Sequence, residues 1–217
     1  MSGDKDQSRR KSTEAAAADG PKGRRLLLIV IAGALLIGGP LLVALQLKPQ
    51  PHAAAGAVGG PFKLVDQDGR TADQTRLLGR WSAVFFGYTY CPDVCPATLQ
   101  MLGAAARRLG PAARDFQVVF ITVDPARDTP EALRRYLKAQ DLPVPALGLT
   151  GSPDEIARAA KAYRVYYAKS GSGADYTMDH SAAIYLMDPM GRFRRPLAPN
   201  MTPALAADQI AATEKEP

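Results

Sequence analysis

The chain has 217 residues, of which 47% are apolar, and it carries a formal net charge of +6. This length and apolar content predict one domain of ordinary size with appendages, and they exclude a chain that is disordered throughout. Residues 1–25 are polar and rich in Ala, Ser, Lys and Arg, which predicts a disordered tail. No aromatic side chains are interleaved with the bases of this tail, so we expect a solvated flank and no binding of nucleic acid.

Residues 26–47 follow the tail, and the stretch from Leu26 to Leu45 carries no charge and is almost wholly apolar. At about 1.5 Å per residue it would extend roughly 30 Å as a helix, which is the thickness of a bilayer core. The basic residues precede it, so the positive-inside rule predicts a single-pass membrane helix with its tail in the cytoplasm. A cleaved signal peptide is the alternative, because residues 53–55 are small, although the apolar region of a signal is shorter, at roughly 7 to 15 residues.

Residues 48–60 are rich in Pro, Ala and Gly and are interpreted as a linker. Residues 61–217 begin with a hairpin over 61–71 and then alternate apolar strand-like runs with helix-forming segments. The expected strands are 82–86, 116–123, 146–149, 180–187 and 192–197. The expected helices are 97–109, 152–163, and two that begin after the capping residues Thr129 and Thr202. This alternation, closed by a hairpin and a helix, predicts an α/β layer fold.

The only two cysteines of the chain, Cys91 and Cys95, lie where the first buried strand meets a helix. This position favours a thioredoxin-like arrangement for residues 61–217. A thiol pair at such a junction is expected to be half exposed and, close to a helix N-terminus, biased towards thiolate. Thiolate is the form that binds soft metal ions and attacks disulfides.

Three interpretations of this pair compete. A purely structural disulfide would close a very small loop, for which the chain-entropy estimate is only roughly 2 kcal/mol. A redox pair usually has two intervening residues, whereas three separate Cys91 from Cys95. A metal site needs a further ligand, and His180 is the candidate, since two sulfurs and one imidazole suit Cu(I) better than structural zinc.

The environment of His180 offers further candidate groups. Asp179 precedes it and is expected to orient the imidazole ring. Residues 180–187 are expected to form a strand in the same sheet as the strand that leads to the cysteines. Thioether sulfurs that copper accepts are present in the same half of the domain, at Met178, Met187, Met190 and Met201, although core or surface packing is the default role of methionine.

Three segments together carry a family resemblance. They are FFGYTYCPDVCP at Phe85 to Pro96, ITVDPARDTPE at Ile121 to Glu131, and DHSAAIYLMDPMG at Asp179 to Gly191. They resemble the Sco/SenC family of copper-binding, thioredoxin-fold proteins, over nearly all of residues 61–208. Tyr90 departs from the histidine or phenylalanine expected in many members.

The resemblance implies a copper chaperone for cytochrome c oxidase assembly, with Cys91, Cys95 and His180 as the copper ligands. It implies Cu(I) as cargo, with Cu(II) as a second form, and oxidase subunit II or another copper-accepting protein as the recipient. A periplasmic copper donor is a further expected partner. The membrane helix would then place the protein in the inner membrane, with its C-terminal domain in the periplasm. The resemblance also places Asp124 at an acidic position near the site, where a turn residue at a strand end is an equal alternative.

Other activities remain open at this point. The main alternative is an enzyme, a thiol–disulfide reductase in which Cys91 and Cys95 are the catalytic dithiol and keep the cysteines of the recipient reduced. A redox or copper sensor is a weaker possibility. A peroxidase is disfavoured, because the sequence shows no convincing extra catalytic set around Cys91.

Overall fold

The structure, a computed structural model, describes residues 58–216. The predicted tail at 1–25, the predicted membrane helix at 26–47 and most of the predicted linker lie outside these residues. Within 58–216, no helix combines the length and the apolar character needed to cross a bilayer.

A seven-stranded mixed sheet forms the centre of the domain, in the order β2-β1-β5-β4-β3-β8-β9. The central strands β3, β4 and β5 are parallel, and the flanking strands pair antiparallel with them. The strands of this sheet are β1 (Lys63–Asp66), β2 (Thr71–Asp73), β3 (Trp81–Gly87), β4 (Phe116–Thr122), β5 (Ala146–Thr150), β8 (Ile184–Met187) and β9 (Phe193–Leu197). The predicted α/β layer fold is therefore confirmed.

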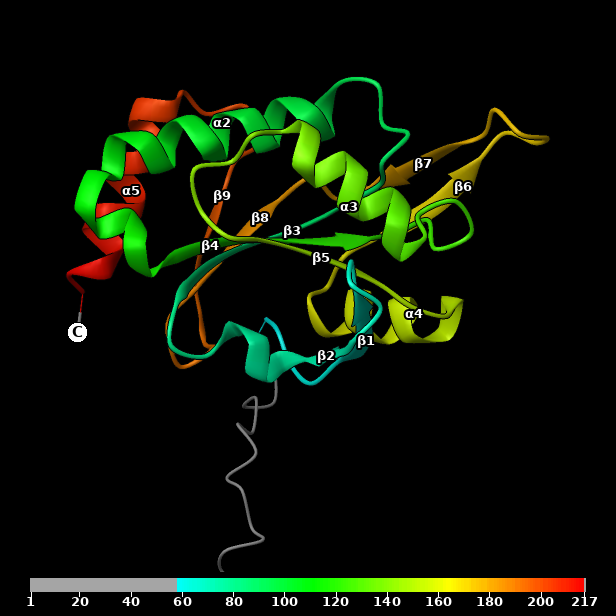
Figure 1. Ribbon diagram of the computed structural model, residues 1–217, viewed down its shortest axis with the longest axis horizontal. Coiled ribbons are helices and arrows are strands. Elements are labelled where there is room, and N and C mark those ends of the chain that lie inside the picture. Colours follow the sequence, from blue (N-terminus) through cyan, green and yellow to red (C-terminus); the bar gives the residue numbers. More distant parts are fainter. Residues whose placement is uncertain (1–57, 217) are drawn as a thin grey trace, which may run out of the picture. The chain divides into compact units, whose positions relative to one another are not determined.

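Helices cover both faces of this sheet, with α2, α3 and α5 on one side and α4 on the other (Figure 1). Their bounds are α2 (Val94–Leu109), α3 (Pro130–Ala139), α4 (Pro153–Ala162) and α5 (Pro203–Glu214), with short 3-10 helices η1 (Gln74–Leu77) and η2 (Gly110–Asp115). Burial on both faces explains why β3 and β4 read as continuous apolar runs in the sequence. The two strands place fully buried aromatic rings in the core, among them Phe85, Phe86 and Phe120.

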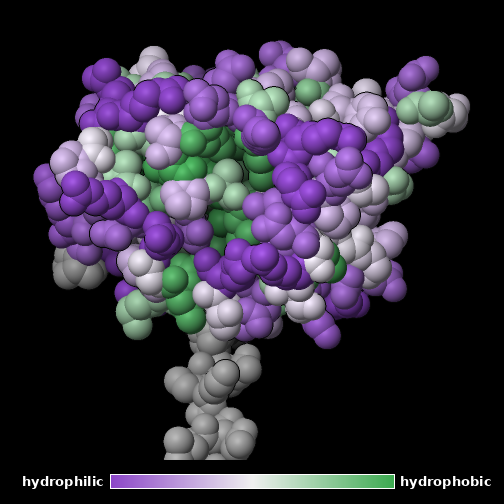
Figure 2. Space-filling view, viewed as in Figure 1, coloured by the Kyte–Doolittle hydropathy of each residue, from purple (hydrophilic) through white to green (hydrophobic). Residues whose placement is uncertain are grey.

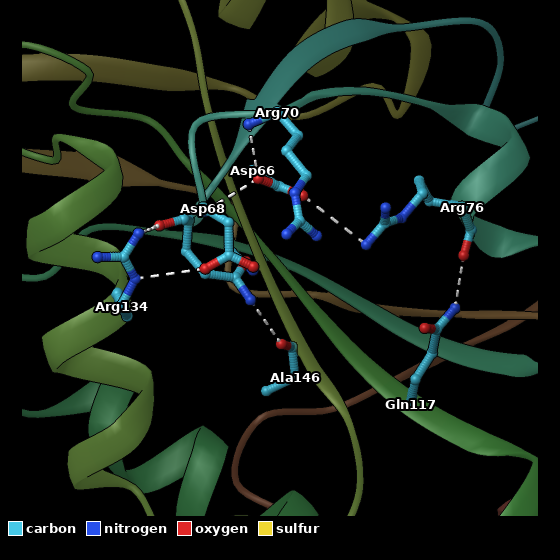
Figure 3. Close-up of polar contacts among 9 residues, drawn as sticks. Asp66, Asp68, Arg70, Arg76, Gln117, Arg134 and Ala146 are labelled. Carbon is cyan, nitrogen blue, oxygen red and sulfur yellow. Dashed lines mark hydrogen bonds and ion pairs between the residues drawn. The ribbon is translucent and has the colours of Figure 1, made fainter.

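The predicted N-terminal hairpin is confirmed as β1 and β2, and its turn is held by one buried carboxylate. Asp66 Oδ1 accepts hydrogen bonds from the backbone N–H groups of Asp68 and Arg70, each at 2.9 Å (Figure 3). Its second oxygen lies 3.8 Å from the guanidinium of Arg76. On the neighbouring helix, Arg134 pairs with Asp68 and fixes α3 to the same turn. This polar cluster fastens the β1–β2 edge of the sheet to α3.

The prediction of one strand over residues 180–187 is wrong. Thr177–His180 forms β7, which pairs with β6 (Tyr167–Ser170) in a separate two-stranded ribbon, and the main sheet is rejoined only at Ile184. The ribbon closes at its base, where the Ser181 N–H donates to the Tyr166 carbonyl at 2.9 Å. Only the second half of the segment, IYLM, has the apolar composition of a buried strand, whereas the first half, HSAA, lacks the β-branched and aromatic residues that strands favour.

The start of α2 also differs from expectation, because the helix begins at Val94 instead of residue 97. Cys95 therefore lies in the first helical turn, where it is completely buried. Gly87 at the end of β3 makes this possible. A Cβ atom at residue 87 would lie 2.8 Å from Cys95 Sγ and 2.9 Å from Phe120 Cε2. Strand and helix can approach this closely because residue 87 lacks a side chain.

We predict that Gly87→Ala lowers the free energy of unfolding by about 1–3 kcal/mol, because the added methyl group overpacks this contact. The measurement is urea unfolding of the full chain, followed by the fluorescence of Trp81, the single tryptophan. Gly60→Ala is the matched control, since its Cβ would meet only the Ala162 methyl at 3.4 Å, and we expect a change within about 1 kcal/mol. Equal stability of Gly87→Ala and the parent would contradict the close-contact argument.

Candidate metal centre

The cysteine pair is reduced, with both residues free, and its two members differ in exposure. Cys95 is buried, whereas Cys91 is partly exposed in the loop before α2. Cys91 Sγ accepts a hydrogen bond from the Cys95 backbone N–H at 3.4 Å. That amide belongs to the first turn of α2, where a backbone N–H has no partner within the helix, so the sulfur takes the place of a capping oxygen.

His180 lies next to this cysteine pair in the fold. Its Nε2 atom lies 3.7 Å from Cys95 Sγ, although 85 positions separate the two residues in the sequence. The strand register explains the meeting. Phe85 near the end of β3 pairs with Ile184 at the start of β8, so residues just before β8 lie beside residues just after β3. His180 was expected to begin a strand of the same sheet as the cysteine strand, which is wrong: it ends β7 in the separate ribbon, and its side chain nevertheless lies beside Cys95.

The imidazole ring is held in one orientation. His180 Nδ1 lies 3.0 Å from the Ser181 carbonyl, and because a carbonyl only accepts, Nδ1 is the donor, which leaves Nε2 facing the Cys95 sulfur at 3.7 Å. The rings of Phe85 and Tyr88 pack against it edge to face, with centroids 6.3 and 6.0 Å away. Asp179, which was expected to orient the ring, is exposed, and the carbonyl of Ser181 takes that role.

The buried cysteine does not have the expected bias towards thiolate. Burial raises the pKa of the Cys95 thiol well above its ordinary value, and the neighbouring Cys91 raises it further, against a lowering contribution from a hydrogen bond with the Tyr88 backbone. Loss of hydration outweighs the helix N-terminus here, because an unpaired thiolate is costly in an apolar site. A metal ion that binds Cys95 must therefore displace its proton.

The donor atoms approach one another without forming a closed cluster. Within residues 58–216, no three or more His, Cys, Asp or Glu side chains form a group arranged to hold a metal ion. The separation of 3.7 Å between Cys95 Sγ and His180 Nε2 is one that a single ion can span, since bonds to sulfur and nitrogen are about 2.3 and 2.0 Å. The chemistry of the pair, one soft sulfur and one imidazole nitrogen, fits copper.

Two of the candidate methionines lie away from this pair. Met187 is buried in β8 opposite Ser82, near the end of β3 that is remote from the cysteines. Met190 is 60% exposed in the turn between β8 and β9. Met178 and Met201 are partly buried and pack against the hydrophobic core. Core and surface packing thus describe the methionines well.

Sequence reasoning singled out Asp124 but missed Asp128 and Arg127, which form a polar network with it behind the cysteine loop. Asp128 is completely buried and accepts hydrogen bonds from the Thr89 backbone N–H at 3.0 Å and from the Thr89 and Thr122 hydroxyls, both at 2.6 Å. Asp124 is also buried and binds Arg127 Nε at 2.5 Å. The sequence signal was the second motif segment, where acidic residues and an arginine follow directly after β4.

The chain is similar to known proteins over most of its length. The SCO1/SenC family model matches residues 50–214. The mitochondrial SCO1 homolog 1 of Arabidopsis thaliana is 41% identical over 152 residues, which is 69% of this chain but only 45% of that relative. Protein SenC of Rhodobacter capsulatus is 41% identical over 160 residues, covering 73% of this chain and 71% of SenC.

A solved structure of the same kind is that of Arabidopsis thaliana ScoI with copper bound. It has a TM-score of 0.69 and 38% sequence identity, and the match covers 73% of this chain and 99% of that one. The family match, the relatives and the shared thioredoxin-like fold agree. The chain therefore belongs to the SCO1/SenC family.

Proposed function

We propose that this chain is a membrane-anchored copper metallochaperone, in which Cys91, Cys95 and His180 bind copper. The observation that carries the proposal is the distance of 3.7 Å between Cys95 Sγ and His180 Nε2. The two residues come from distant segments, and a soft sulfur and an oriented imidazole lone pair face one another. Copper in the related plant ScoI structure supports the choice of metal.

The chemistry of transfer follows from the unequal exposure of the two cysteines. In the metal-free protein, Cys91 sulfur is engaged by the Cys95 backbone N–H, and copper would draw it into the ligand set. Two thiolates and one imidazole hold Cu(I) and leave a face open to an incoming ligand. Since Cys91 is the more exposed donor, exchange with an acceptor would begin on its side. Tyr90 and Val94 flank it and are 62% and 42% exposed, which offers an apolar surface to a docking protein.

The recipient we propose is subunit II of cytochrome c oxidase, in the assembly of its dinuclear copper centre, or another copper-accepting protein. Membership of the SCO1/SenC family supports this recipient. Copper would arrive from a periplasmic donor. Cu(I) is the expected cargo, because the two sulfurs favour the softer ion, and Cu(II) is the second form.

We predict that His180→Ala weakens copper binding at least about tenfold, because removing a direct ligand costs at least as much as removing a supporting residue. The measurement is competition for Cu(I) between the reduced full chain and a chromophoric chelator. Asp179→Asn is the matched control, since Asp179 is exposed and the ring is oriented by Ser181, and its affinity should equal that of the parent. Unchanged affinity in His180→Ala would show the ligand assignment to be wrong.

A thiol–disulfide reductase is the second candidate function, and the free thiols at positions i and i+4 favour it. The two thiols would reduce a disulfide of the partner by exchange, giving a Cys91–Cys95 disulfide and two thiols on the partner.

We predict that His180→Ala leaves the rate of oxidation of this dithiol within about threefold of the parent, since the histidine supplies no electrons to the exchange. Mass spectrometry after alkylation of free thiols measures this rate. A collapse of the rate would show that the histidine serves the redox chemistry as well.

The expected topology is an inner-membrane anchor at residues 26–47, a cytoplasmic tail at 1–25 and a periplasmic domain. The basic tail before the apolar stretch supports this orientation.

We predict that a reporter enzyme active only outside the cytoplasm is active when fused after Pro217. The same reporter fused within residues 1–25 is the control and should be inactive. The opposite pattern of activities would reverse the proposed orientation.

A further inference from the structure

Arg127 lies where three segments of the domain meet. Its Nε atom donates to the buried Asp124 carboxylate at 2.5 Å, next to the end of β4. Its Nη1 atom donates to the Ala174 carbonyl in the loop between β6 and β7, at 3.3 Å. The side chain is only 15% exposed. This cation therefore ties the end of a central strand to the tip of the ribbon that carries His180.

The third segment is the cysteine loop, and aromatic rings from this loop and from the ribbon enclose the guanidinium group. Its central carbon lies 3.6 Å from the centroid of the Tyr176 ring on the ribbon, and 4.5 Å from that of Tyr90 in the cysteine loop. Tyr88, also in that loop, is 5.9 Å away. Within residues 58–216, the Nη2 atom is buried without a hydrogen-bond partner, as expected for an N–H group that faces rings.

Asp124 completes the connection, because it is bound from both sides. Its second carboxylate oxygen accepts a hydrogen bond from the Tyr176 hydroxyl at 2.6 Å, while the first binds Arg127. Tyr176 is thus fixed both by its ring and by its hydroxyl group. Lys169 of β6 also lies over this ring, with Nζ 3.9 Å from the centroid.

The fixed tyrosine stands directly before β7, which ends at His180. A β-strand advances about 3.3 Å per residue with little freedom to bend, so anchoring its first end restricts where its last residue lies. At that last residue, the edge-to-face contact between His180 and Tyr88 returns to the cysteine loop. The contacts of Arg127 with Asp124 and Tyr176, here called the Arg127 clamp, lie at the start of β7. The His180 imidazole lies at the end of the same short, rigid strand.

We propose that Arg127 is a positioning residue, which holds the β6–β7 ribbon so that His180 faces Cys95. The proposal rests on the ligand set given under the proposed function. Lysine would not replace arginine, because the planar guanidinium both hydrogen-bonds Asp124 in its plane and stacks on rings with its faces. The alternative is that Arg127 only stabilises the domain, in which case its loss has no specific effect on the histidine.

A double-mutant cycle on the full chain separates these two roles. The variants are Arg127→Met, Arg127→Lys, His180→Ala and the double variant Arg127→Met/His180→Ala, with Cu(I) affinity measured by chelator competition. We expect Arg127→Met, and to a similar extent Arg127→Lys, to weaken binding about 10- to 100-fold. In the His180→Ala background, Arg127→Met should change affinity less than about twofold, because it acts through the absent ring. Arg135→Met is the matched control, since Arg135 is exposed on α3 and pairs with Glu131, and it should leave affinity unchanged.

X-ray absorption of the copper-loaded Arg127→Met variant gives an independent readout, with loss of the imidazole scattering expected. Equal losses of affinity in both backgrounds, or no loss in Arg127→Met, would overturn the positioning role while leaving the ligand set intact. If His180→Ala alone leaves affinity unchanged, the ligand set itself is wrong, and the positioning role falls with it. Should Arg127→Met not fold, Tyr176→Leu at the ribbon end of the same clamp decides the question by the same cycle.

Discussion

The parallel pairing of β3 with β4 determines where the segments around the site leave the sheet. The pairing runs from Trp81 to Gly87, so the cysteine loop and the segment after β4 leave the sheet at the same edge. The antiparallel pairing of β8 brings the chain before Ile184 to that edge as well. Three segments that are far apart in the sequence thus meet above one buried sheet. Figure 2 shows polar residues over much of one face of the domain, with apolar residues gathered near its centre.

The two cysteines differ in burial and therefore in reactivity. Cys95 packs against the sheet below Gly87, and burial keeps its pKa high, so the metal-free thiol is protonated and protected. Cys91 remains partly exposed, and its sulfur accepts a long hydrogen bond from the Cys95 backbone N–H. One sulfur is thereby fixed in the core and the other is more exposed, which suits the proposed uptake and release of copper by ligand exchange. A pair with both sulfurs buried would bind copper without an exit for it.

Much of this could be predicted from the sequence, because local patterns are strong where strands and helices are buried or capped. The apolar runs of β3 and β4, the Thr129 and Thr202 caps and the strand-to-helix position of the cysteines all carried through to the structure. The ribbon was missed because its second strand, TMDH, is short and polar, unlike the buried run IYLM of β8, and only its pairing with β6 shows that it is a strand. The roles of Ser181 and Arg127 could not be predicted, since a backbone carbonyl has no sequence signature and ring stacking depends on contacts across the fold.

Measuring the copper environment in the full chain tests the proposed ligand set of Cys91, Cys95 and His180 most directly. The protein with reduced cysteines would be loaded with copper and then studied by metal analysis and X-ray absorption. We expect one copper per chain, bound by two sulfurs and one imidazole nitrogen. Copper bound without sulfur or without nitrogen, or no stable copper together with a readily cycling disulfide, would contradict it.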